Sequence, residues 1–600
     1  MEIKKYASRD EIPVKDTWAT EDLYPSDEAW SMELETLPEE TKLLASFEGT
    51  LGHDAQNLLN YLTEMERVDC KAELLGSYCS RKSDQDTRNS AARAMVGRFR
   101  TLYTVLSAAS SFETPEIMAI DDETLEKFYA ECPGLERYRR YLTDMRRMKE
   151  HTLSAAEERL MAAAAEMAAA PQSIFGAFSN ADLVYPDAVD SEGKPHPLTR
   201  GGYVSLQKNP DRGLRKDAYE KMFSTIGNYR NTAAAMLNGQ GKQLKFYADA
   251  RKYPSTLDAA LDRTNVPTSV YHNLIEAVHE NLPTLHRYMA MRKRLMGLEE
   301  LHFYDVYMPI LADFDKQIPF EQAKQTVHDS LHVLGEAYQA ILREGFENRW
   351  IDVYETPGKR GGAYSSGSRV HPYILLNYNH GLTGQFTLAH ELGHAVHSYL
   401  SNRTQNPVDA HYKIFVAEVA STCNEALMMR DLLGKTNDKR ERAYLINHFL
   451  EKFRTTLCRQ TMFAEFELFM GNVIGQGGTL TADLLCEEYK RLNALYYGSD
   501  MVMDDYIAME WARIPHMYYN YYVFQYATGF SAAVALSNKI LEEGAPAVER
   551  YLNFLSSGCT KSPIELLKDA GVDMTTPEPV NNALALFADL LDEMEALMEE

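Results

Sequence analysis

The chain has 600 residues and a formal net charge of -25, because 87 Asp and Glu outnumber 62 Lys and Arg. An acidic chain is poorly suited to bind nucleic acid or an anionic membrane surface, so we expect neither as a partner. No stretch stays apolar for the ~20 residues that a membrane helix needs, so we also expect no membrane span.

The N-terminal segment, residues 1–23, lacks the apolar run of a secretory signal peptide. The seven cysteines form no CxxC pair and suggest no disulfide framework. We therefore expect reduced thiols in a cytoplasmic protein. The sequence carries no signal for the oligomeric state.

Most of the chain is predicted to be helical, because apolar residues recur at spacings of three and four. Clear examples are residues 154–170 and 231–250. The pattern breaks at residues 182–206, where Pro, Gly and Asp between short β-prone runs predict a hairpin. We place a domain boundary there, which divides the chain into residues 1–185 and 186–600.

The helical pattern breaks a second time at residues 355–385, where the loop GKRGGAYSSG leads into the extended run HPYILLNYN. The loop lacks the GxxxxGK[ST] order of a phosphate-binding loop, so a nucleotide site is not predicted. The extended run can offer a strand edge to a peptide, and an ordinary surface loop is the alternative. We expect a small sheet beside the helix that follows.

That helix, QFTLAHELGHAVHSYL (385–400), carries His390, Glu391 and His394 within an apolar run. Residues four apart share a helix face, so the two imidazoles project side by side and can bind one Zn²⁺. Glu391 lies between them, where its carboxylate can reach a water at the metal, as in other HExxH helices. The alternative is a pair of packed core histidines, but buried polar groups without partners are costly. We expect a zinc site.

The pattern of this helix does not identify the third protein ligand of the metal. His397 lies seven residues after His390, about 10 Å along the helix, so its ring cannot easily join the same ion. The segment IFVAEVASTCNEALMMRDLL (414–433) places Glu418 and Glu425 seven apart on one apolar face. One can bind zinc while the other orients a histidine, and the spacing does not decide which. Surface acids are the alternative, weakened by the apolar neighbours.

A third segment, RIPHMYYNYYVFQYATG (513–529), carries His516 and tyrosines at positions 518, 519, 521, 522 and 526. Such side chains can donate hydrogen bonds to the oxyanion of a tetrahedral intermediate, where one donor can change the rate by ~10²–10³. The alternative is an aromatic packing stripe, which we expect for most of these tyrosines.

Together, HELGHAVH, FVAEVASTCNEAL, GKRGGAYSSG and RIPHMYYNYYVFQYATGFSAA resemble the M3 metallopeptidases, the thimet oligopeptidase group. The resemblance is closest to the bacterial oligoendopeptidase F branch. The segment DTWATEDLYPSDEAW (16–30) resembles the N-terminal signature of that branch. It implies a mainly α fold with a helical N-terminal domain of oligoendopeptidase F type. It also implies a large helical catalytic domain with a small β-sheet near the active site, and a deep enclosed substrate channel.

The resemblance implies that Glu418 is the third zinc ligand and that Glu425 supports the site. It also points to His516 and to two tyrosines, which align best with Tyr522 and Tyr526. The spacing from His516 differs by one residue from the thimet-type pattern, so two other tyrosines remain competitors, Tyr519 and Tyr521.

The sequence therefore predicts a zinc oligoendopeptidase that holds one ion and hydrolyses internal bonds of short peptides. Glu391 takes a proton from the attacking water and passes it to the leaving nitrogen. A zinc exopeptidase on the same scaffold is one alternative, although no GAMEN aminopeptidase signature is present. A noncatalytic peptide- or zinc-binding protein is the other, and the retained Glu391 disfavours it.

Overall fold

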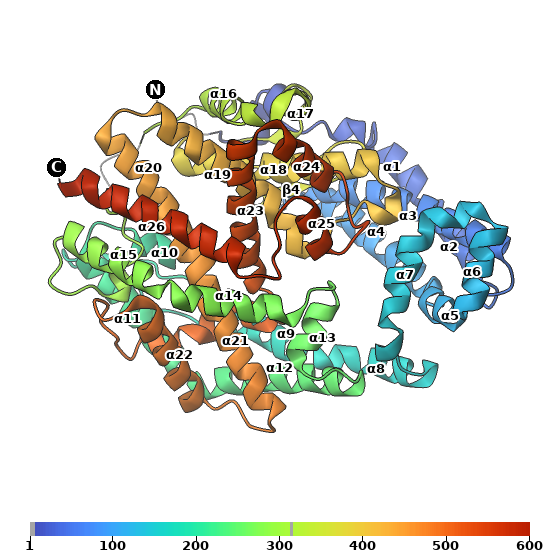
Figure 1. Cartoon of the computed structure of the whole chain (residues 1–600), viewed down its shortest axis with the longest axis horizontal. Helices are drawn as coiled ribbons and strands as arrows, with labels where there is room; N and C mark the ends of the chain where they lie inside the picture. Colours follow the sequence, from blue (N-terminus) through green and yellow to red (C-terminus); the bar gives the residue numbers. More distant parts are fainter. Residues whose placement is uncertain (1–5, 312–315, 600) are drawn as a thin grey trace. The chain divides into compact units, whose positions relative to one another are not determined.

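The computed structural model of the chain describes residues 6–311 and 316–599. Helices dominate these residues, and the strands are few and short (Figure 1). The prediction of a mainly α fold with a small sheet is confirmed. Over the same residues, no helix has both the length and the apolar character needed to cross a membrane.

The chain divides into two compact units, each assembled from separate segments. The first unit contains the described parts of residues 1–150, 316–428 and 536–571, and the second contains those of 151–315, 429–535 and 572–600. The division of the chain at residues 185 and 186 into an N-terminal and a catalytic domain stays a prediction.

The first unit holds the N-terminal helices and the helices around the small sheet. The N-terminal helices are α1 (Asp27–Leu34), α2 (Leu37–Ala45), α3 (Ala55–Gln85), α4 (Ser90–Ala109), α5 (Glu113–Ala119), α6 (Asp122–Glu131) and α7 (Arg139–Arg147). The later ones are α16 (Phe320–Ser330), α17 (Gly335–Glu347), α18 (Leu382–Thr404), most of α19 (Ile414–Lys435), the end of α23 (Phe524–Glu543), α24 (Ala545–Leu555) and α25 (Pro563–Asp569).

The core of the first unit forms around α3. This helix begins at the cap Asp54, whose side chain accepts from the Asn57 N–H, and buries side chains three and four residues apart. They are Leu58, Tyr61, Leu62, Met65, Val68, Ala72 and Leu75. Trp18, Tyr373 and Leu375 join the same core, so the sheet is fixed to the N-terminal helices.

The sheet of the first unit has the order β3–β5–β4, with β3 at Ile351–Asp352, β4 at Tyr364–Ser366 and β5 at Tyr373–Leu375. β3 pairs with β5 in parallel and β4 pairs with β5 antiparallel. The buried Lys359 ammonium lies 2.8 Å from the Asp352 carboxylate and also donates to three main-chain carbonyls around the sheet. Edge strand β4 lies against α18, so the predicted sheet beside the histidine helix is confirmed.

The second unit contains the remaining elements. Its helices are α8 (Ala155–Ala168), α9 (Ala170–Ala177), α10 (Tyr203–Gln207), α11 (Arg212–Gly227), α12 (Arg230–Ala250), α13 (Thr256–Asp262), α14 (Thr268–Glu280) and α15 (Leu282–Leu295). They are followed by the end of α19, α20 (Lys439–Lys452), α21 (Arg459–Gly475), α22 (Ala482–Tyr497), the start of α23 and α26 (Glu578–Glu599). Strands β1 (Ala188–Val189) and β2 (Pro195–His196) pair antiparallel, which confirms the predicted hairpin.

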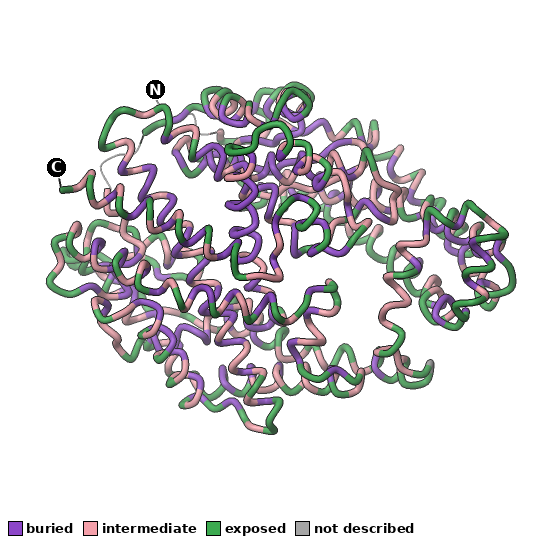
Figure 2. The backbone as a smooth tube through the Cα atoms, in the orientation of Figure 1, coloured by how far each residue is buried: buried purple, intermediate pink, exposed green. Residues whose placement is uncertain are grey.

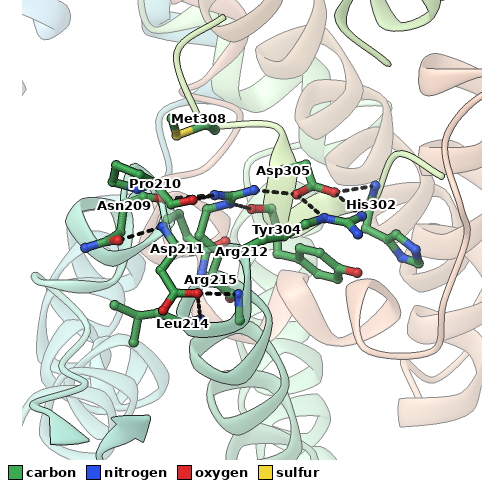
Figure 3. Close-up of polar contacts among 12 residues, drawn as sticks. Asn209, Pro210, Asp211, Arg212, Leu214, Arg215, His302, Tyr304, Asp305 and Met308 are labelled. Carbon is green, nitrogen blue, oxygen red and sulfur yellow. Dashed lines mark hydrogen bonds and ion pairs between the residues drawn. The ribbon is translucent and has the colours of Figure 1, made fainter. Parts of the chain in front are cut away.

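An ion-pair network around the buried Asp305 fixes α11 in the second unit (Figure 3). The Asp305 carboxylate is fully buried and accepts from Arg212 at 2.9 Å and from Arg215 at 2.8 Å. Arg215 also donates to the main-chain carbonyl of Tyr304 at 3.1 Å. Buried charges are tolerated when they are paired and hydrogen-bonded in this way, so the segment around Asp305 is tied to the start of α11.

Candidate metal centre

The two helices that carry the predicted ligands, α18 and α19, approach each other backbone to backbone. A Cβ atom at Gly393 would lie 2.5 Å from the Ser421 Cα and 2.6 Å from the Ala420 carbonyl oxygen. The Asn424 amide of α19 donates to the carbonyl of Ala389 on α18 at 3.1 Å. Glycine thus permits the approach, and the asparagine fixes its register.

Helix α18 is buried along most of its length (Figure 2). Sequence analysis did not single out Gly393 or Asn424. A glycine inside an apolar helical pattern is the signal that could have marked a close helix contact. No comparable signal marks Asn424, because its role depends on a second helix.

The structure brings His390, His394 and Glu418 together. The Glu418 Oε2 lies 3.4 Å from the His390 Nε2 and 3.6 Å from the His394 Nε2. One potential ligand atom from each of the three side chains lies within 4.8 Å of the other two. Among the described residues, no other group of three or more His, Cys, Asp or Glu side chains clusters in this way. Tetrahedral zinc with bonds of ~2.0–2.1 Å places its ligand atoms about 3.4 Å apart. The donor set and its spacing therefore fit one zinc ion.

Glu425 contacts the second ring nitrogen of His390. Its Oε1 lies 2.6 Å from the His390 Nδ1, which favours a proton on Nδ1 and leaves the Nε2 lone pair for a metal. Burial opposes the charged imidazole, but the hydrogen bonds with Glu418 and Glu425 outweigh it and raise the pKa of His390 to about 10. A metal must displace this proton when it binds.

Glu391 lies outside the clustered ligand group and is buried, with 6% of its surface exposed. Burial raises the pKa of its carboxyl to about 7, with nearby Glu418 adding to the rise, while the main chain of Ser365 on β4 supplies an opposing hydrogen bond. An acid with a pKa near neutrality can both accept and donate a proton under working conditions.

His397 is packed into the interior of the first unit. Its ring stacks on Tyr412 with centroids 3.7 Å apart and an interplanar angle of 5°, and it also contacts Phe554. Burial lowers the pKa of His397 to about 3, so the ring is neutral. Its position agrees with the expectation that it is not a ligand.

His516, Tyr522 and Tyr526 lie in the second unit and form a cluster of rings. The His516 centroid is 6.3 Å from Tyr522 and 6.2 Å from Tyr526, and the two tyrosines are 5.4 Å apart. Tyr519 joins the same cluster, 5.4 Å from His516, and is 44% exposed. Burial lowers the pKa of His516, and the charge of Arg200 adds to this effect.

The two other tyrosines of this segment are buried away from that cluster. Tyr521 shares a 2.7 Å hydrogen bond with the Thr256 hydroxyl, and Tyr518 stacks on Phe175 with centroids 4.5 Å apart. The packing interpretation therefore applies to Tyr518 and Tyr521.

The comparisons with known proteins agree with the geometry. Residues 205–586 match the protein-family model described as "Peptidase family M3". Residues 116–185 match the family model described as "Oligopeptidase F". The chain belongs to peptidase family M3. It is 44% identical to the oligopeptidase PepF of Bacillus subtilis (strain 168) over 591 residues, which cover 98% of this chain and 88% of that protein.

Solved structures match this chain over nearly its whole length. The oligoendopeptidase-F of Enterococcus faecium is 38% identical with a TM-score of 0.76, and the match covers 96% of this chain and 99% of that one. A solved chain from Chlamydophila abortus is 35% identical with a TM-score of 0.91, covering 99% and 100%. With the matching N-terminal model, these likenesses place the chain in the oligoendopeptidase F branch of family M3.

We expect Gly393→Ala to lower both bound metal and peptidase activity in this M3 peptidase. The added Cβ pushes α19 away from α18 and moves Glu418 away from the two histidines. Metal content by atomic spectroscopy and peptide hydrolysis would both be measured. Gly434→Ala on α19 is the matched control, since nothing lies within 4 Å of its Cβ position. A Gly393→Ala protein with full metal and activity would contradict the role of the close approach.

Proposed function

We propose that this M3 peptidase is a zinc-dependent oligoendopeptidase that hydrolyses internal bonds of short peptides. The observation that carries the proposal is the convergence of His390, His394 and Glu418, whose ligand atoms lie within 4.8 Å of one another, beside the buried acid Glu391. When bound there, one zinc ion would supply a Lewis acid that polarises a carbonyl and lowers the pKa of water.

In this proposal, Glu391 is the general base and acid. It accepts a proton from the water that attacks the scissile carbonyl, and then delivers that proton to the leaving nitrogen. Its raised pKa, near 7, suits both steps. Glu425 keeps the proton of His390 on Nδ1 through their 2.6 Å contact, so His390 stays oriented as a ligand.

We assign stabilisation of the oxyanion to His516 together with Tyr522 or Tyr526, as the family resemblance implies. The clustering of the three rings supports this assignment. Imidazole and phenol groups can donate hydrogen bonds to the developing charge. Tyr519 shares the cluster and remains the competitor, whereas the buried Tyr521 is disfavoured.

Endopeptidase action on short peptides is favoured over the alternatives. The relatives from Lactococcus and Enterococcus are described as oligoendopeptidases F, which supports internal cleavage over a zinc exopeptidase. The presence of Glu391 disfavours a noncatalytic binding protein. The seven cysteines are unpaired in the structure, which fits a reducing cytoplasmic location.

Glu391→Gln is expected to keep the metal and to lose turnover. The amide retains the size of the side chain but cannot accept a proton, so kcat should fall by at least ~10²–10⁴. Metal content and steady-state hydrolysis of a fluorogenic peptide would be measured on the same preparation. Unchanged turnover with a full complement of metal would rule out Glu391 as the base.

Tyr522→Phe or Tyr526→Phe is expected to lower kcat by ~10²–10³ with little change in KM, because the lost hydroxyl acts on the transition state. Each variant would be compared with Tyr519→Phe. The assignment is wrong if both variants keep the parental kcat, or if the loss occurs only in Tyr519→Phe.

A further inference from the structure

The segment that carries His516 and Tyr522 turns sharply between them. Asn520 and Tyr521 have φ angles of 59° and 56°, in the left-handed region that residues with side chains rarely adopt. Two such residues in succession persist only where their surroundings hold them. The contacts of Asn520 and Tyr521 therefore decide where Tyr522 lies relative to His516.

Three helices of the second unit hold this turn. Glu467 of α21 accepts from the Tyr521 N–H at 3.0 Å. Thr256 of α13 bonds the Tyr521 hydroxyl at 2.7 Å, and the Gln240 amide of α12 donates to the Asn520 side chain at 2.9 Å. Glu467 thus holds the backbone of Tyr521 itself, whereas Thr256 holds its side chain, and Gln240 holds the Asn520 side chain and also donates to the Tyr518 carbonyl at 3.5 Å.

Helix α21 also leaves room for the Tyr521 side chain. Gly471 lies four residues after Glu467 on the same helix face. A Cβ atom at Gly471 would lie 1.9 Å from the Tyr521 hydroxyl oxygen and 3.2 Å from the ring carbon that bears it. One face of α21 therefore provides both the acceptor for the Tyr521 backbone and the space for its ring.

The burial of the Glu467 carboxyl is not offset by an ion pair with another described residue. It is 5% exposed, and no ion pair involving it is found within residues 6–311 and 316–599. Its Oε2 has no hydrogen-bond partner in the same part of the chain, and the side chain lines a cavity of about 30 Å³. Burial raises the pKa of Glu467 to about 8, against the effect of the Tyr521 N–H, so the carboxyl is mostly neutral at pH 7.

We propose that Glu467 is a positioning residue for the oxyanion donors: it pins the left-handed turn at Asn520 and Tyr521 and so sets the places of His516 and Tyr522. This inference rests on the proposed function, which assigns those two side chains to the oxyanion. Glu467 itself does not touch the substrate. Since a misplacement of about 1 Å can cost ~10² in rate, a loosened turn lowers kcat more than KM.

The test compares two substitutions at Glu467 in the full-length, metal-loaded enzyme. Glu467→Met keeps the length of the side chain but removes the acceptor, and its kcat is expected to fall by about 10–100-fold. Its KM and metal content are expected to stay at parental values. Glu467→Gln keeps an acceptor oxygen on a neutral side chain, and its kcat is expected to stay within about 3-fold of the parent.

Glu465→Met is the matched control on the same helix. Glu465 accepts from the Tyr496 hydroxyl at 2.9 Å and lies 2.7 Å from His279, and it makes no contact with the turn among the hydrogen bonds described. This substitution also removes carboxylate contacts of α21, but kcat is expected to remain parental. Equal kcat losses in Glu465→Met and Glu467→Met, or a parental kcat in Glu467→Met, would overturn the inference.

Two further variants separate the possible failures. If Glu467→Met does not fold, Gly471→Ala disturbs the same turn through Tyr521 and is expected to lower kcat, and a parental kcat there would overturn the inference. His516→Ala tests the underlying assignment. A parental kcat in His516→Ala overturns the oxyanion assignment together with this inference. A loss in His516→Ala without a loss in Glu467→Met overturns the positioning role alone.

Discussion

The backbone contact between α18 and α19 is the constraint on which the candidate metal centre depends. The helix pattern alone sets the two histidines of α18 four residues apart, but the third donor comes from another helix. Gly393 lets the helices approach until a Cβ atom would clash with the main chain of Ser421, and the Asn424 amide holds their register. At that separation a single carboxylate oxygen of Glu418 reaches both imidazoles.

Three buried or half-buried acids, Glu391, Glu425 and Glu467, differ in their partners and therefore in their roles. Burial raises the pKa of Glu391 towards neutrality against the opposing charge of His390, so this carboxyl can exchange protons. Glu425 is tied to a histidine and serves to orient that ring. Glu467 is buried with one N–H as its partner and is mostly neutral, which suits a group that holds a backbone turn.

Local patterns predicted much of this fold, because helix periodicity and turn residues act over short stretches of chain. The helix 385–400, the hairpin near 182–206 and the short sheet before the histidine helix all follow from such patterns. The choice between Glu418 and Glu425 could not follow from spacing, because both lie on one face and the crossing of two helices separates them. The turn at Asn520 and Tyr521 contains no glycine, and although Asn is enriched in left-handed turns, Asn520 alone does not predict this one, because contacts with distant helices hold it. For the same reason, the pattern could not divide the tyrosines into buried and clustered sets.

Mapping the cleavage products tests the central claim most directly. A mixed pool of short peptides and one folded protein would be incubated with the enzyme as isolated, after chelation, and after chelation followed by zinc. The products would be identified by mass spectrometry. The account predicts internal cuts in the short peptides only, lost on chelation and restored by zinc. Trimming from one end of each peptide, or internal cleavage that persists in the metal-free enzyme, would contradict it.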